Sequence, residues 1–151
     1  MSEDPFNLER FPGAQDPVYP RVRSELAAGA KRSHWMWFIF PQLQGLGSSA
    51  TARAFALSSL AEARAYLAHP LLGARLRECT ELVNGLRHRT PEEIFGYPDH
   101  LKFHSSMTLF ARAATGEADR SLFREALARS FGGEEDPLTV RSLTSDAGTS
   151  G

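Results

Sequence analysis

The sequence predicts an all-α protein in which about seven helices form one compact domain. Apolar residues recur at three- and four-residue spacing through most of the chain, and helix-capping residues such as Thr90 open several of these segments. Convincing strand-like alternation between turn residues is absent from the sequence. A length of 151 residues, with 42% hydrophobic and 23% charged residues, is that of a single domain able to bury a core.

The first two helices are predicted from their start signals. One helix is expected over residues 4–11, because Asp4 can cap its first turn, and the dipeptide Pro12-Gly13 is expected to end it. The second helix is expected to begin at Pro20, where apolar residues start to recur on one stripe.

The densest aromatic stretch of the chain, WMWFIF at residues 35–40, follows the second helix. The odd and the even positions of this stretch are all apolar, so the alternation of a half-buried strand is missing. A buried helical turn and an extended segment therefore fit equally well. Burying each large side chain is worth roughly 1.5–3 kcal/mol, so the stretch is expected to hold its polar neighbours, His34 and Gln42, in fixed positions. Gly45 and Gly47 then form a turn that allows positive φ or a close approach to a ligand.

The rest of the domain is divided by further start signals. A helix over 50–57 follows a serine cap, Ser59 opens a capping box, and the clearest amphipathic helix covers 70–86. The small polar segment 144–151 is expected to be a flexible tail, so the domain covers 4–143. The remaining helices are expected to begin at Thr90, Asp99, Asp119 or Ser121, and Asp136.

Charge and cysteine content exclude several function classes. A net charge of −1 gives no basic footprint for nucleic acid or an anionic membrane, so neither partner is expected. The single cysteine, Cys79, excludes an intramolecular disulfide and a cysteine-based metal cage. The pair His100 and His104 is weak evidence for a metal, and no metal or cofactor is expected. Without a long apolar run or a basic N-terminal region, we expect a cytoplasmic location.

The first group of candidate site residues borders the aromatic stretch. His34 can exchange protons near neutral pH, and Trp35 or Trp37 can stack on a ring such as a nucleobase, with Gln42 beside them. The structural alternative is that the histidine satisfies a backbone carbonyl and that both tryptophans only pack.

A second group follows the expected helix start at Asp99. Asp99, Lys102 and Ser106 share one helix face, and Ser105 and Ser106 suit a helix interior only if their hydroxyls have partners. These side chains could hold a polar ligand, with Lys102 on a phosphate or carboxylate. The alternative is a helix cap with an ion pair between positions i and i+3.

A third candidate is Arg75, which lies on or beside the buried stripe of its helix. A buried arginine requires an anionic partner. Either Asp99, Asp136 or Glu62 supplies that charge, which is the structural interpretation, or the phosphate of a ligand does.

The same segments resemble the bacterial and fungal family catalogued as domain of unknown function 1810, over residues 4–143. The resemblance implies a compact all-helical domain. Some members carry the label calpastatin, but calpain inhibition relies on a disordered chain built of repeats. The segments that carry the likeness are SHWMWFIFPQ at 33–42, GLG at 45–47, AYLAHPLLGARL at 65–76, FG at 95–96 and DHLKFHSSMTLF at 99–110.

A fainter similarity links the chain to the YbiA-like family of helical proteins, some of which cleave N-glycosidic bonds in NAD and ADP-ribose metabolism. The order of features is alike: a polar and aromatic block, then a helix containing Met107, then an acidic residue, here Asp136. No catalytic position is transferred from that family.

Two functions are therefore expected. The first is a small-molecule binding protein or hydrolase, with a pocket between the aromatic stretch and the helix that starts at Asp99. Its ligand would be nucleotide-like or ADP-ribose-like, with Arg75 and Lys102 on phosphate and His34 or Asp99 as acid or base; N-glycosidic hydrolysis is the sharpest form. The second is a non-enzymatic interaction module whose polar groups pair with one another. The sequence indicates no oligomeric state.

Overall fold

The computed structural model describes residues 4–150, and side chains as far as Thr144. It confirms the all-α class, since the described residues form helices and, apart from one isolated bridge between Leu43 and Leu57, no strand pairing. The described part contains ten helices rather than about seven. The helices are α1 (Arg10–Gln15), α2 (Tyr19–Ala28), α3 (Met36–Ile39), α4 (Ala50–Phe55), α5 (Leu60–Ala68), α6 (Pro70–Asn84), α7 (Pro91–Phe95), α8 (Asp99–Ala113), α9 (Glu117–Phe131) and α10 (Pro137–Ser150).

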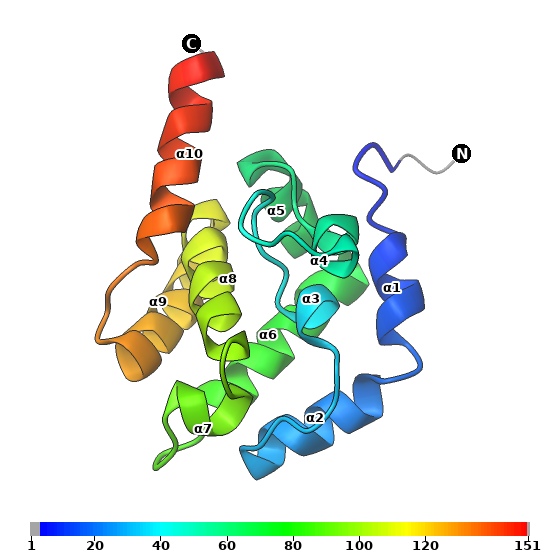
Figure 1. Cartoon of the computed structure of the whole chain (residues 1–151), viewed down its shortest axis with the longest axis vertical. Helices are drawn as coiled ribbons and strands as arrows, with labels where there is room; N and C mark the ends of the chain where they lie inside the picture. Colours follow the sequence, from blue (N-terminus) through cyan, green and yellow to red (C-terminus); the bar gives the residue numbers. More distant parts are fainter. Residues whose placement is uncertain (1–3, 151) are drawn as a thin grey trace.

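Helix α8 is the main packing element, in contact with α5, α7, α9 and α10. Helix α6 crosses the middle of the molecule and packs against α2, α5 and α9 (Figure 1). Helix α2 lies across one end, at the bottom of Figure 1, while α10 extends beyond the opposite end. The core that these helices enclose is rich in fully buried aromatic side chains: Phe11, Trp35, Phe40, Tyr66, Phe103, Phe110 and Phe123.

The aromatic stretch at residues 35–40 forms a single helical turn, α3, which decides between the two conformations that its sequence allows. Phe40 meets Phe103 edge to face at 5.0 Å between ring centroids, a favoured geometry for aromatic pairs. Trp37 and Phe38 are only half-buried. The stretch therefore anchors the loop that follows it, and Trp37 keeps one side near the surface.

The expected helix over residues 4–11 is wrong in position. Asp4 caps a separate turn by accepting hydrogen bonds from two backbone amides, and α1 starts only at Arg10. The dipeptide Pro12-Gly13 lies inside α1 instead of ending it. Proline is tolerated there because the amide groups of a first helical turn have no partner within the helix.

Several predicted caps are confirmed. Ser49 and Ser59 each accept a backbone hydrogen bond at the start of α4 and α5, and Thr90 forms a full capping box. The box predicted at Ser59 is only half formed, because the Glu62 carboxylate accepts from Ser58 instead of the Ser59 amide. Helix α9 begins at Glu117, before the predicted start at Asp119 or Ser121. Helix α8 does begin at Asp99, but the Asp99 side chain does not cap it and binds two lysines instead.

Helix α10 continues to Ser150, through most of the segment predicted as a flexible tail. Gly151 and the side chains after Thr144 lie outside the described residues, so flexibility there stays a prediction. None of the helices in the described part of the chain has the length and apolar character needed to cross a membrane.

Candidate functional site

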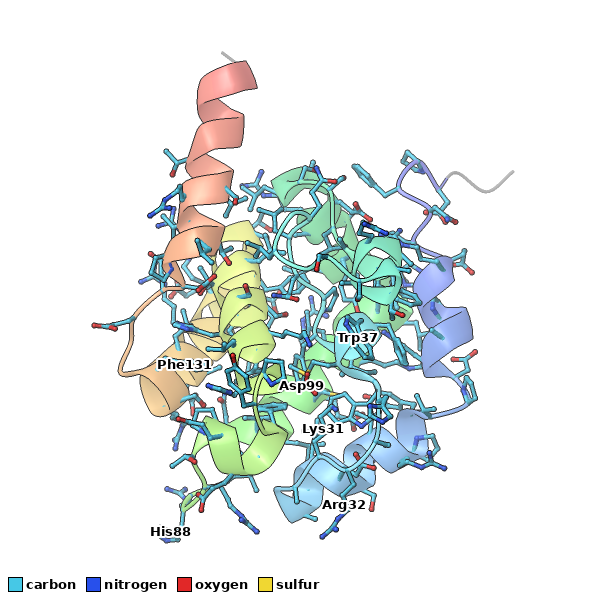
Figure 2. All side chains as sticks on the ribbon, in the orientation of Figure 1. Lys31, Arg32, Trp37, His88, Asp99 and Phe131 are labelled. Atoms are coloured by element: carbon cyan, nitrogen blue, oxygen red, sulfur yellow. The ribbon has the colours of Figure 1, made fainter. Side chains whose placement is uncertain are left out.

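Two of the predicted polar residues, Asp99 and Lys102, meet Lys31 in what we call the lysine–aspartate cluster. The two carboxylate oxygens of Asp99 bind Lys31 Nζ at 2.7 Å and Lys102 Nζ at 3.1 Å. Lys31 also lies over the ring of Trp35 and Lys102 over that of Trp37, at 5.1 and 5.3 Å from the ring centroids. Figure 2 shows Lys31, Asp99 and Trp37 near the middle of the molecule.

This arrangement fixes the charge of Asp99. Burial alone would raise the pKa of its carboxyl group, but the hydrogen bonds and charges of Lys31 and Lys102 outweigh burial and hold the pKa below its usual value. At neutral pH Asp99 is therefore a carboxylate that cannot donate a proton. His34 is exposed, and the structure gives it no hydrogen bond or ion pair with another described residue.

Lys102 contributes less to this cluster than Lys31. Its side chain is 21% exposed and its bond to Asp99 is the longer one, so Lys31 keeps its counter-charge when Lys102 is removed. We expect Lys102→Ala to lower the free energy of unfolding by about 1 kcal/mol or less, as measured by urea denaturation. A loss several times larger would show that Lys102 is required to neutralise the core.

Arg75 has its partners where α1 ends and α2 begins. It donates to Asp16 Oδ1 at 2.8 Å and to Gln15 Oε1 at 3.1 Å, and its guanidinium lies 4.6 Å from the centroid of the Tyr19 ring. The expectation of Asp99, Asp136 or Glu62 as the partner is wrong, because the segment between α1 and α2 packs against α6.

The two adjacent serines of α8 differ in role. Ser105 Oγ donates to Asp136 Oδ2 at 3.2 Å and lies 3.0 Å from Thr139 Oγ1, so it helps to fasten α10 to α8. Ser106 Oγ is buried and has no hydrogen-bond partner among the described residues. Neither serine lines the hollows described below.

A hollow of about 630 Å³ opens between the loop after α3, helix α4 and helix α10. We call it the arginine hollow. Gly45 in its rim has φ of +91°, which confirms the expected use of glycine in this turn. The residues that line it are Leu43, Gln44, Gly45, Gly47, Arg53, Ala56, Arg141 and Ser142.

The charged side chains described in the arginine hollow are both positive. Arg53 comes from α4 and Arg141 from α10, and no carboxylate is found among the described residues of the lining. The described side chains give neither arginine an ion pair. Leu43, only 1% exposed, and Ala56 add an apolar wall. Two guanidinium groups beside an apolar wall suit an anion with an apolar part, because guanidinium matches carboxylate and phosphate geometry.

A second hollow, of about 540 Å³, is lined by Arg112, Arg124 and Glu135, among others. There Glu135 binds Arg112 through two hydrogen bonds of 2.7 and 2.8 Å. One of its two arginines is therefore paired within the chain, and the arginine hollow is the better anion site.

Two residues that the sequence singled out border the arginine hollow. Trp37 and Gln42 line a small adjoining cavity, which shares Leu43, Gly47 and Ala56 with it. The sequence did not identify Arg53 and Arg141, because two single arginines on distant helices have no local pattern. The aromatic stretch with Gln42 and the glycines of the turn were the signals in the sequence that pointed to this place.

Fold and site together define a small all-helical protein with a cationic hollow beside a buried aromatic stretch. The chain belongs to the family described as "Protein of unknown function (DUF1810)", whose model matches residues 5–143. It is 59% identical to the conserved hypothetical protein Rv1873 from Mycobacterium tuberculosis, whose crystal structure superposes with a TM-score of 0.90. That match covers 93% of this chain and 99% of the other. Comparison with curated proteins gives no match.

Proposed function

We propose that this protein binds a small phosphate-containing molecule, nucleotide-like or ADP-ribose-like, in the arginine hollow. One observation carries the proposal: Arg53 and Arg141 line the same hollow, where the residues with described side chains include no carboxylate. The volume of about 630 Å³ falls within the usual range for small-molecule sites. The arginines would hold phosphate, and the ring of the ligand would lie against the apolar wall toward Trp37.

The geometry supports binding better than catalysis. Hydrolysis of an N-glycosidic bond benefits from a group that protonates the leaving base, and Asp99 is held as a carboxylate between two lysines. As far as its side chains are described, through Thr144, the hollow is lined by no histidine, carboxylate or cysteine. The proposed activity is therefore recognition of the ligand, and hydrolysis would need a proton donor from the ligand or from water.

The test is titration calorimetry with ADP-ribose, ADP, NAD and pyrophosphate, supported by thermal unfolding. A ligand at about 100 times its dissociation constant should stabilise the wild type by about 2.7 kcal/mol. Arg53→Ala and Arg141→Ala should each weaken binding about tenfold or more, because a hydrogen bond to a charged group is worth about 1.5–3 kcal/mol. Tighter binding of ADP-ribose than of pyrophosphate would show that the ring contributes.

The matched control for this test is Arg129→Ala, which removes an exposed arginine paired with Glu125 on α9, away from the hollow. It should leave the affinity unchanged. Wild-type protein that binds none of the four compounds, or arginine variants that bind as tightly as the wild type, would refute the proposal.

A second candidate function is a non-enzymatic interaction module. The pairing of Asp99 with Lys31 and Lys102, and of Arg75 with Asp16, favours it, because these polar groups are satisfied within the chain. A well-folded protein that binds no tested ligand would favour this second function.

A further inference from the structure

Helix α10 is fastened to α8 by a cluster of hydrogen bonds that we call the α10 lock: Ser105, Thr108, Asp136 and Thr139. Asp136 Oδ2 accepts from Thr139 Oγ1 at 2.6 Å, from the Thr139 amide at 3.1 Å and from Ser105 Oγ at 3.2 Å. The amide of Asp136 donates to Thr108 Oγ1 at 2.9 Å. The lock thus caps α10 and ties it to α8 at the same point.

Three of the four lock residues are buried although all are polar, and Asp136 is partly buried. Thr108 and Thr139 are fully buried and Ser105 is 3% exposed. Buried hydroxyls with fixed partners allow one arrangement only, because any shift leaves a polar group without its hydrogen bond. Leu138 in the first turn of α10 is 56% exposed, so apolar packing does not hold this end of the helix.

The arginine hollow depends on where α10 lies. Arg141 and Ser142 are two and three residues after Thr139 on the same helix, and both line the hollow. Arg53 belongs to α4, which has no part in the lock. A change in the lock would therefore move Arg141 relative to Arg53.

We infer that the four residues of the α10 lock are positioning residues of the anion site: they hold Arg141 at a fixed place opposite Arg53. None of the four lines the hollow, so none is a ligand-contacting residue. The inference rests on the proposed function. It assigns to Ser105 a role in placing a binding residue, where the sequence suggested direct contact with the ligand.

The test uses two variants of one residue and ADP-ribose as the probe. Thr139→Val keeps the shape of the side chain but removes the hydroxyl, and it should weaken binding about fivefold or more. Thr139→Ser keeps the hydroxyl and should bind nearly as tightly as the wild type. Ser105→Ala is the second variant, should Thr139→Val fail to fold.

A double-mutant cycle separates positioning from general destabilisation. Because the lock acts through Arg141, Thr139→Val should have no further effect in an Arg141→Ala background, yet keep its full effect in an Arg53→Ala background. In the ligand-free protein, hydrogen exchange of the amides at 140–144 should become faster in Thr139→Val, with exchange in α6 unchanged.

The outcomes are distinct. Three results would overturn the inference and leave the proposed function intact. The first is that Thr139→Val binds ADP-ribose as tightly as the wild type. The second is that Thr139→Val loses the same affinity in the Arg53→Ala and Arg141→Ala backgrounds, and the third is that hydrogen exchange in α10 is unchanged. Failure of the wild type to bind the probe, with the three other compounds also failing, would overturn both.

Discussion

Replacing Glu25 with alanine is expected to lower the free energy of unfolding by about 4 kcal/mol. The carboxylate of Glu25, a residue only 8% exposed, accepts four hydrogen bonds. Three come from the amides of Arg32 and Ser33 and the hydroxyl of Ser33, and the fourth from the indole of Trp35 at 2.8 Å. Alanine would leave these donors without their acceptor, and the indole of Trp35 among them is fully buried.

Urea denaturation at neutral pH measures this loss, with Glu25→Gln as an intermediate variant. The glutamine keeps one acceptor oxygen but loses the charge, so about 2 kcal/mol is expected. Glu125→Ala is the control, because Glu125 is an exposed residue of a surface ion pair. Equal losses in Glu25→Ala and Glu125→Ala would contradict the role assigned to the buried carboxylate.

The contribution of Glu25 also depends on pH. Burial would raise the pKa of its carboxyl group, but the hydrogen bonds outweigh burial and lower the pKa. A lowered folded-state pKa stabilises the protein above the unfolded value of about 4.3, and this stabilisation is lost as the pH falls through the folded pKa. The difference between the wild type and Glu25→Gln should therefore narrow in acid.

Glu25 illustrates what the sequence could and could not predict. Capping boxes and apolar spacing are local, so the class and most helix starts, such as the one after Thr90, could be read directly. The bond between Glu25 and Trp35 joins a helix to a loop ten residues away, and no local pattern signals it. The start of α1 was misplaced because Asp4 can cap an isolated turn as readily as a helix.

The candidate site shows the same limit more strongly. The sequence marked Trp37 and Gln42 through the dense aromatic stretch, and both border the arginine hollow. It could not pair Arg53 with Arg141, since only the packing of α10 on α8 brings them to one place. Charged residues can be recognised in the sequence. Which of them have no oppositely charged partner depends on the tertiary structure.

Replacing Asp99 with asparagine is the second change with a large expected effect, about 2–3 kcal/mol of unfolding free energy. The ammonium group of Lys31 is on a side chain that is only 7% exposed, and it would lose its counter-charge. Lys102 would lose less, since it is the more exposed of the two lysines. Denaturation at pH 7 measures the loss, with Glu117→Gln, an exposed carboxylate 80% open to solvent, as the control.

Two further measurements separate the charge from the shape of Asp99. Adding Lys31→Met to Asp99→Asn should recover part of the lost stability, because it removes the more buried of the two unpaired ammonium groups and leaves only the more exposed Lys102. Since the pKa of Asp99 is lowered, its contribution is complete above the unfolded value of about 3.9 and disappears as the pH falls through the folded pKa. The gap between the wild type and Asp99→Asn should close in acid. A gap that persists there, or a double variant no more stable than Asp99→Asn, would mean that Asp99 acts through packing rather than through its charge.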